Sequence, residues 1–353
     1  MSEAAICVVV PVYKAMATLD RCVESVLAQQ VEGGLTCILV DDGSPDESGA
    51  LCDAWAAKDG RVTVIHQDDL GVSGARNSGL AAADSEFIVF LDSDDALRPG
   101  ALQAALTAQR AAPQDFVVWH YTTDEKAPAA VTADAEPRTQ AGLARLWLDC
   151  LLAMPWNKLY RADLAKQLQF DVQYTLGEDL QFVLDYISLL GQTVPEFGYR
   201  VMTSPLTFYD CSRGGTLSTR YHANYCDIWP KHFAKLNAAC HAAACPAEDM
   251  RPLHRAELQV FAEGVADIMR RDPSPTQRLK GYKAEAALRS PWLRALLERM
   301  KIEHCYSAYY LPCRWRNVGL VCRVDEARRT NAPLYGKLDW AGYYLLLGRM
   351  RRD

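Results

Sequence analysis

The 353-residue sequence lacks a long apolar run and an excess of basic residues. No stretch reaches the roughly 18 consecutive apolar residues that a membrane-spanning helix requires. The acidic Glu3 lies where a secretory signal peptide carries positive charge. A general nucleic-acid-binding protein usually has a basic excess, whereas the formal net charge here is −6. We therefore expect a cytoplasmic protein that does not bind nucleic acid.

Two glycine-rich phosphate-binding patterns are also absent, GxGxxG and GxxxxGK followed by Ser or Thr, which weighs against nicotinamide-dependent enzymes and P-loop nucleotidases. The 12 cysteines are scattered through apolar patterns, so we expect free thiols in a reducing compartment. Histidines lie near cysteines without a repeated zinc-binding framework, as in His222 with Cys226, His241 with Cys240 and Cys245, and His304 with Cys305. A zinc site is therefore not favoured.

What the sequence does contain is an alternation of two periodicities over its first 120 residues. Short, β-branched apolar runs predict buried strands at 6–10, 36–40, 62–66, 87–91 and 116–120. Apolar residues at helical spacing predict helices between them, at 19–27, 47–58, 74–83 and 99–111. This order predicts an α/β fold with a Rossmann-like, mostly parallel sheet flanked by helices.

Polar residues follow each of the first four predicted strands. The segments after them read PVYK, DDGSPD, QDDLGVSGARNSG and DSDD. Ligands of such sheets bind at the carboxyl ends of the strands, so we expect these polar residues to converge on one site. The adjacent acids Asp41 and Asp42 fit either a turn with a helix cap or a contact to a base or ribose. Arg76 would lie beside the acidic turns, where it could face a diphosphate.

Three carboxylates follow directly after the fourth predicted strand: Asp92, Asp94 and Asp95. Their mutual repulsion is tolerable if they are solvated turn and capping residues, or if some of them face a cation. Hard oxygen ligands one residue apart suit Mg²⁺ or Mn²⁺, which also bind substrate phosphate oxygens. The position of the triplet at the end of a buried strand favours the cation.

The second half of the sequence changes character. Residues 122–140 lack periodicity and predict an exposed insertion. Helical patterns follow near 142–153 and 178–190, with strands near 199–209, and beyond residue 221 the pattern is helical throughout. We predict an α/β catalytic domain over residues 1–218 and a helical C-terminal region over 219–353.

Four ordered segments carry a family resemblance: VVVPVYKAMATLDRCVESVLAQ, ILVDDGSPDES, GVSGARNSGL and FIVFLDSDDALRPGAL. Together, over roughly residues 5–110, they resemble the N-terminal half of family 2 glycosyltransferases with the GT-A fold, of the kind that assembles bacterial polysaccharide and lipopolysaccharide. The resemblance implies an inverting hexosyl- or N-acetylhexosaminyltransferase that uses a nucleotide-diphospho-sugar, usually UDP-linked, with Mn²⁺ or Mg²⁺. Its acceptor would be a glycan or a lipid-linked oligosaccharide.

The resemblance also implies roles for individual residues. Asp94, with Asp92, would bind the metal. Asp179 would be the catalytic base with Glu178 beside it, although acids at a helix start also stabilise the helix dipole. The donor would be bound by a larger set: Pro11, Val12, Tyr13, Asp41, Asp42, Arg76, Asp92, Ser93 and Arg213.

Three questions stay open at this stage. Trp156 fits either a sugar-stacking role or the core. The basic end of the chain, 338–353, fits either an anionic membrane surface or a helix docked on its own domain. A sugar nucleotidyltransferase and a non-catalytic sugar-nucleotide or glycan-binding protein remain as alternative functions, although the first usually has an N-terminal glycine-rich loop that PVYKAMATLD lacks.

Overall fold

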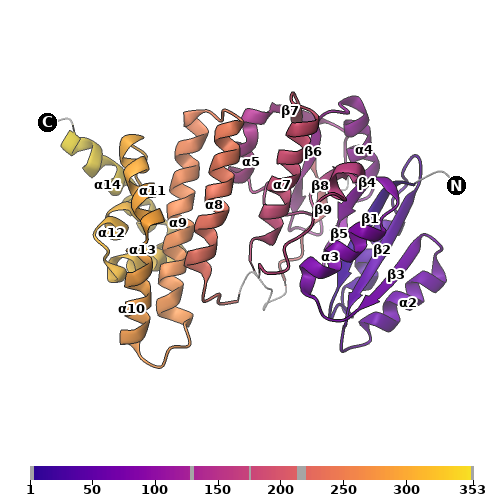
Figure 1. Ribbon diagram of the computed structural model, residues 1–353, viewed down its shortest axis with the longest axis horizontal. Helices are drawn as coiled ribbons and strands as arrows, with labels where there is room; N and C mark the ends of the chain where they lie inside the picture. The colour runs from indigo at the N-terminus through magenta and orange to yellow at the C-terminus, as the bar shows by residue number, and fades with distance from the viewer. Residues whose placement is uncertain (1–3, 128–130, 175, 213–219, 351–353) are drawn as a thin grey trace. The chain divides into compact units, whose positions relative to one another are not determined.

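The computed structural model describes residues 4–127, 131–174, 176–212 and 220–350, and for 342–350 only the backbone (Figure 1). The chain divides into two compact units, Met1–Gly214 and Gly215–Asp353. Among the described residues, no helix is both long and apolar enough to cross a membrane. Arg213, predicted to contact the donor, lies outside the described residues.

The first unit is built on a nine-stranded mixed sheet of order β3-β2-β1-β4-β8-β6-β9-β5, in which β7 pairs with β9. Strands β3, β2, β1 and β4 are parallel neighbours, as are β6 and β9. The predicted α/β fold and its five strands are confirmed. The strands are β1 (Ala4–Val12), β2 (Leu35–Asp42), β3 (Val62–Gln67), β4 (Ser85–Phe90), β5 (Ala96–Leu97), β6 (Phe116–Thr122), β7 (Ala135–Thr139), β8 (Lys158–Arg161) and β9 (Gly198–Phe208).

The sheet is mixed because β8 runs antiparallel between β4 and β6. The sequence did not predict this strand, since it is short and begins with a charged residue. Lys158 is fully buried there, and its ammonium group donates to the carbonyl oxygens of Leu151 (2.7 Å) and Met154 (2.5 Å) and to Asn157 Oδ1 (2.6 Å). These three acceptors offset the cost of removing the charge from water.

Residues 122–140 contain strand β7, which the sequence did not predict. It pairs antiparallel with β9, and most of its residues are exposed or half-exposed. An edge strand of this kind needs no apolar face and tolerates Pro137, so no alternating apolar pattern reveals it.

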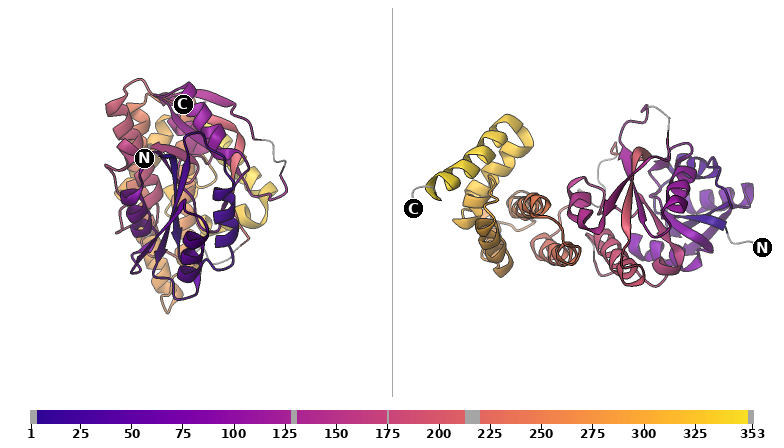
Figure 2. Two further views of the ribbon diagram at one scale, coloured as in Figure 1. Left: turned by 90° about the vertical axis from the view of Figure 1, so that its right-hand side faces the viewer. Right: turned by 90° about the horizontal axis from the view of Figure 1, so that it is seen from above.

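Helices cover both faces of the sheet (Figure 2). One core, formed from the β1 side chains Val8, Val10 and Val12, packs against the first, second and fourth helices. On the opposite face α3 packs against β1 and β2. The helices of this unit are α1 (Leu19–Leu27), α2 (Ser48–Lys58), α3 (Gly71–Ala82), α4 (Ala101–Ala111), the 3-10 turn η1 (Gln140–Gly142), α5 (Leu143–Leu148), α6 (Ala162–Ala165) and α7 (Glu178–Thr193).

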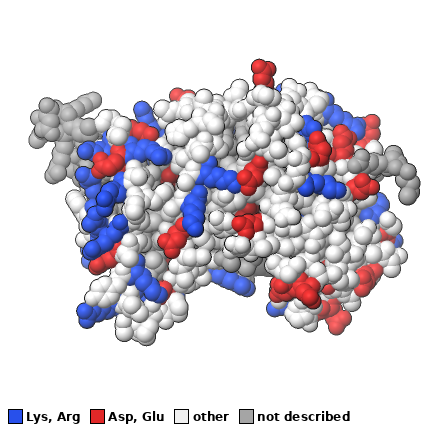
Figure 3. Space-filling model, in the orientation of Figure 1, with Lys and Arg blue, Asp and Glu red and all other residues white. Residues whose placement is uncertain are grey.

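The second unit is helical throughout its described residues, as its sequence predicted. Its own core gathers apolar side chains such as Phe261, Leu293 and Tyr309. Figure 3 shows many Lys and Arg side chains on the face of this unit that it draws. The helices are α8 (Tyr225–Ala242), α9 (Ala247–Arg271), α10 (Gln277–Ala287), α11 (Pro291–Ile302), α12 (Tyr310–Arg314), α13 (Val318–Thr330) and α14 (Ala332–Met350).

Candidate functional site

A buried arginine joins three segments of the first unit. Arg76 on α3 has only 3% of its side chain exposed, and its Nη2 donates to Asp92 Oδ1 at 2.9 Å in the turn after β4. Its Nη1 donates to Asp179 Oδ1 at 2.5 Å in the first turn of α7. The guanidinium group also lies 5.3 Å from the ring centroid of Phe170. Arg76 therefore holds the predicted metal-binding turn and the predicted base next to each other.

Local packing explains how α3 positions Arg76. Gly79, on the same helix, lies so close to the sheet that an added Cβ would come within 2.3 Å of Val9 Cγ1. Asn77 forms two hydrogen bonds of 2.8 Å with the backbone of Phe170, which precedes α7. The close packing of α3 on the sheet fixes the position of Arg76. The hydrogen bonds of Asn77 fix the segment that leads into α7.

Asp179 has the electrostatics of a proton acceptor. Removal from water raises the pKa of its carboxyl group to about 7, and the negative charges of Glu178 and Asp92 act in the same direction. Arg76, and more weakly Lys158, oppose this rise by favouring the ionised form. A carboxylate with this pKa can accept a proton near neutral pH, where an ordinary Asp would be a weaker base.

The carboxylate turn after β4 carries less negative charge than its sequence indicates. Asp92, Ser93 and Asp94 are half-buried, whereas Asp95 is fully buried. Burial, followed by the charges of Asp92 and Asp94, raises the pKa of Asp95 to about 9, so this residue is a neutral acid at pH 7. The half-buried carboxylates of Asp92 and Asp94 therefore remain in the turn to face a cation.

Two residues that brace this turn, Arg21 and Asp210, have no role in the sequence-based predictions. Arg21 on α1 donates to the Asp94 carbonyl oxygen at 2.5 Å and to Asp210 Oδ2 at 2.6 Å. The backbone nitrogen of Asp210, just beyond β9, donates to Asp95 Oδ1 at 3.0 Å. Arg21 lies on a helix surface, where an arginine is usually solvated, so no local pattern could single it out.

The two acids at the end of β2 point to different partners. Asp42 Oδ1 accepts hydrogen bonds from Gln67 Nε2 (2.7 Å) and from the Leu70 backbone nitrogen (2.9 Å). Asp41 is hydrogen-bonded to His66 Nδ1 (2.9 Å) and accepts from the Ser44 backbone nitrogen (3.1 Å). Although burial raises it, these bonds hold the pKa of Asp41 below its usual range. Asp41 thus has the contacts of a turn-forming residue.

The other predicted donor contacts lie at the end of the neighbouring strand. Val12 is paired with Asp41 across β1 and β2, and both Pro11 and Val12 are buried. Tyr13, which follows them directly in the chain, is 44% exposed. Pro11, Val12, Tyr13, Asp41 and Asp42 therefore share the same sheet edge.

Trp156 belongs to the core. Only 3% of it is exposed, and its ring stacks on Tyr209 with centroids 5.3 Å apart. The proposed contact with a sugar face is therefore not supported by its position.

A surface cavity of about 630 Å³ lies away from these residues, at the start of β4. Ser85 and Phe87 line it together with the basic side chains Arg110, Arg161 and Lys166. None of the predicted site residues that the structure describes lines this cavity, so it is separate from the site around Arg76.

Fold and site together define an α/β protein with a braced carboxylate turn after β4 and two buried acids, Asp41 and Asp42, at the end of β2. Residues 7–169 match the family described as Glycosyl transferase family 2. This match covers a little under half of the chain and agrees with the resemblance seen in its motifs.

Solved structures share the fold. The S. aureus TarS fragment 1–349 in complex with UDP-GlcNAc superposes with a TM-score of 0.60 at 17% identity, over 92% of this chain and 91% of that one. The mannosyltransferase PcManGT from Pyrobaculum calidifontis, in complex with GDP-Man and Mn²⁺, superposes with a TM-score of 0.50 at 16% identity, over 90% and 87%.

Curated relatives are more similar in sequence over shorter regions. Glycosyltransferase GlyG of Streptococcus pneumoniae serotype 4 is 39% identical over 122 residues, which are 34% of this chain and 40% of GlyG. The succinoglycan biosynthesis protein ExoO of Rhizobium meliloti is 39% identical over 211 residues, 54% of this chain and 58% of ExoO. The uncharacterised glycosyltransferase EpsJ of Bacillus subtilis is 30% identical, over 50% of this chain and 54% of EpsJ. The chain therefore spans about half the length of these relatives.

Proposed function

We propose that this protein is an inverting, metal-dependent glycosyltransferase. It transfers a hexosyl or N-acetylhexosaminyl group from a nucleotide-diphospho-sugar to a hydroxyl group of a glycan or lipid-linked acceptor, in the assembly of cell-surface polysaccharide. The observation that carries the proposal is the double ion pair of Arg76, which brings Asp92 of the carboxylate turn and Asp179 of α7 to one place.

The donor is proposed to be UDP-linked. Asp42 and Tyr13, with their buried neighbours Pro11 and Val12, lie at the sheet edge where a base and ribose would bind. The fold neighbours include one structure with UDP-GlcNAc and another with GDP-Man, so a panel of UDP-, GDP- and CMP-sugars tests the choice of nucleotide. Ser93 and Arg213 complete the proposed donor contacts.

The carboxylate turn fits a hard divalent cation such as Mn²⁺ or Mg²⁺. Asp94, together with Asp92, offers carboxylate oxygens that are half-exposed at the end of a buried strand. Oxygen ligands of this type, shared with substrate phosphates, suit these cations better than softer metals. When bound, the metal would stabilise the negative charge that develops on the leaving diphosphate.

The chain's own residues then perform a single displacement. Asp179 accepts the proton of the acceptor hydroxyl group while the hydroxyl oxygen bonds to the anomeric carbon. The bond from that carbon to the diphosphate oxygen breaks, and its electron pair stays on the diphosphate, so the configuration inverts. Arg76 keeps Asp179 oriented and adds positive charge beside the turn that faces the diphosphate.

Asp179→Asn tests this mechanism. The amide can still accept a hydrogen bond from Arg76 but cannot accept the proton, so transfer should fall by roughly 10²–10⁴-fold, the usual contribution of a general base. Wild-type transfer should rise as the pH increases through about 7, because only the ionised form of Asp179 accepts a proton. Transfer rates across a pH series, with donor affinity from calorimetry, measure both effects.

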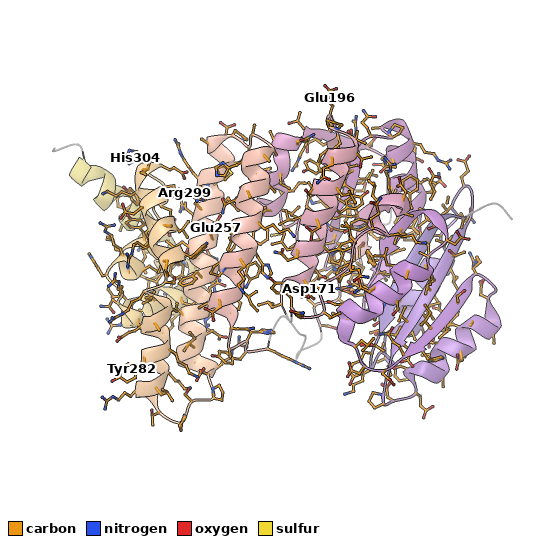
Figure 4. The ribbon with its side chains drawn as sticks, in the orientation of Figure 1. Asp171, Glu196, Glu257, Tyr282, Arg299 and His304 are labelled. Atoms are coloured by element: carbon orange, nitrogen blue, oxygen red, sulfur yellow. The ribbon has the colours of Figure 1, made fainter. Side chains whose placement is uncertain are left out.

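The matched control is Asp171→Asn, an exposed acid on the segment before α7 that Figure 4 labels. This variant should transfer sugar at the wild-type rate. If Asp179→Asn kept more than about a tenth of wild-type transfer, Asp179 would not be the base. If the wild type bound donors without transferring sugar to any acceptor in a broad panel, the non-catalytic alternative would replace the proposal.

A lipid-linked acceptor would place the protein at the cytoplasmic face of the membrane. The support for this step is the basic C-terminal end of the sequence, with nine Lys and Arg against four Asp and Glu from His304 onward. Basic segments of this kind bind anionic lipid surfaces. The proposed contact is peripheral.

A further inference from the structure

The helical unit contains a cluster of three metal-ligating side chains far from the carboxylate turn in sequence: His254, Glu303 and Cys305. One ligand atom of each, the imidazole nitrogen, a carboxylate oxygen and the thiol sulfur, lies within 4.8 Å of the other two. His254 comes from α9, while Glu303 and Cys305 flank the turn that ends α11. His254 and Cys305 are buried, and the side chain of Glu303 is 29% exposed. The cluster is therefore enclosed on one side and open to solvent through Glu303.

The geometry of the turn explains how two ligands come from positions two residues apart in one loop. The Cys305 backbone nitrogen donates to the Met300 carbonyl oxygen (3.0 Å), and the His304 nitrogen to that of Lys301 (3.3 Å). His304, between the two ligands, has a left-handed φ of 55°. These are the bonds and conformation of a Schellman motif, which reverses the chain at a helix end. His304 itself is exposed and is not part of the cluster (Figure 4).

Asn237 orients the His254 ring. Its side-chain nitrogen donates to Glu257 Oε1 (2.7 Å) and to the Phe233 carbonyl oxygen (2.8 Å), so its Oδ1 faces His254 Nε2 at 3.2 Å. Nε2 also lies 3.3 Å from Arg299 Nη1, which is a donor. In the tautomer whose Nε2 donates to Asn237 Oδ1, the lone pair of Nδ1 is directed at Glu303 Oε2, 2.6 Å away. Metal-binding histidines commonly have such a partner, which selects the tautomer and fixes the ring.

We propose that His254 Nδ1, Glu303 Oε2 and Cys305 Sγ bind a divalent cation of the zinc class. Two hydrogen-bond acceptors as close as Nδ1 and Oε2 need a proton or a cation between them, and a thiol next to them favours a cation that accepts sulfur. Protein ligands at about 2.0–2.1 Å from zinc lie roughly 3.3 Å apart in a tetrahedron, so Glu303 has to withdraw by less than about 1 Å. Its partly exposed side chain has room to do so.

The cation would act as a structural link in this unit. It would join α9 to the turn between α11 and α12, elements that are otherwise connected through apolar packing and through Arg299, whose Nη1 lies 3.3 Å from His254 Nε2. The inference does not depend on the proposed transferase activity, because none of the three ligands belongs to the α/β unit.

Cobalt substitution tests the proposal on the full chain. The protein is stripped with a chelator, dialysed and titrated with Co²⁺, whose thiolate complexes absorb through sulfur-to-metal charge transfer. We expect this absorption to saturate at one Co²⁺ per chain and to disappear when Zn²⁺ is added. Co²⁺ at the carboxylate turn would not produce it, because Asp92 and Asp94 offer only oxygen.

Cys305→Ser should remove the charge-transfer absorption, whereas Cys313→Ser, a buried thiol of the same unit outside the cluster, should retain it. His254→Gln should weaken Co²⁺ binding by at least about tenfold. Circular dichroism confirms that each variant is folded. Absence of the band in the wild type, or its survival in folded Cys305→Ser, would reduce the cluster to a hydrogen-bonded triad and overturn the proposal.

Discussion

Arg76 shows how one buried charge can organise a site. Its guanidinium group is almost fully enclosed, and its two carboxylate partners come from positions 16 and 103 residues further along the chain. A buried charge with partners of opposite sign is stable only as a set, since removal of one member leaves the others desolvated and unpaired. Arg76 therefore contributes to folding as well as to the site.

Arg76→Ala should lower the free energy of unfolding by about 3–5 kcal/mol, because Asp92 and Asp179 would lose their shared partner. Urea unfolding followed by circular dichroism measures the change. Arg61→Ala is the matched control: its ion pair with Asp59 is half-exposed at the surface, and surface pairs contribute little. Equal effects of the two substitutions would contradict the assigned role of the buried pair.

Residue patterns predicted part of this site and missed the rest for a physical reason. Asp92 and Asp94 were singled out because they follow a buried strand, and Arg76 because it was expected beside the acidic turns; their roles stay predictions. Arg21 and Asp210 were not found, since their contact joins positions 189 residues apart and neither lies in a distinctive pattern. His254 was not predicted as a ligand either, because its partners Glu303 and Cys305 lie about 50 residues away. His304, between these two partners, is exposed and lies outside the cluster.

At the scale of elements, the pattern of apolar residues determined what could be predicted. Strands β1, β2 and β4 are covered on both faces and read as continuous apolar runs, and the helices between the strands follow the 3.6-residue period. Strand β3 is the edge of the sheet and, against the prediction of a buried strand, is half-exposed. Strands β7 and β8 were not predicted, because β7 is an exposed edge strand and β8 begins with the buried Lys158. Their register depends on partners distant in sequence, which no local period encodes.

The contact between α3 and the sheet gives an element-scale prediction. Gly79→Ala places a methyl group within 2.3 Å of Val9 and 3.2 Å of Val40, so α3 must move away from β1 and β2. We expect a loss of about 1–3 kcal/mol in the free energy of unfolding, the usual cost of overpacking. A weaker affinity for the donor should accompany it, because Arg76 moves with the helix.

Gly60→Ala is the control for this substitution, since an added Cβ there meets no atom within 4 Å. Thermal unfolding and donor titration of both variants give the comparison. A Gly79→Ala protein as stable as Gly60→Ala would mean that α3 is not fixed by this contact.

At the scale of the whole molecule, each unit has its own apolar core. The second unit carries 23 of the 38 Lys and Arg residues, nine of them from His304 onward. In α14, Asp339 accepts a hydrogen bond from the Ala308 backbone nitrogen at 2.9 Å and is paired with Arg255, so the start of this helix is docked on its own unit. The proposed membrane contact therefore concerns residues after this docked portion.

A chain ending at Ala341 tests that contact, because it keeps the Asp339 bonds and removes Arg349, Arg351 and Arg352. Each basic residue near an anionic surface contributes about 1 kcal/mol. The affinity for phosphatidylserine-containing liposomes, measured by sedimentation, should therefore fall roughly a hundredfold. Arg289→Ser with Arg294→Ser, which removes charge elsewhere in the unit, should have a smaller effect. Unchanged sedimentation of the shortened chain would exclude the end of the chain as the contact.

The bracing of the carboxylate turn has a consequence for biosynthesis. Arg21 and the turn itself leave the ribosome early, but the strand that pairs with β5 and the acid that binds Arg21, Asp210, are synthesised more than a hundred residues later. Until Asp210 has emerged from the exit tunnel, a nascent chain carries β5 unpaired and its acidic turn without its final hydrogen bonds. The braced turn can therefore form only after the first unit has been fully synthesised, and prematurely terminated chains should depend on chaperones.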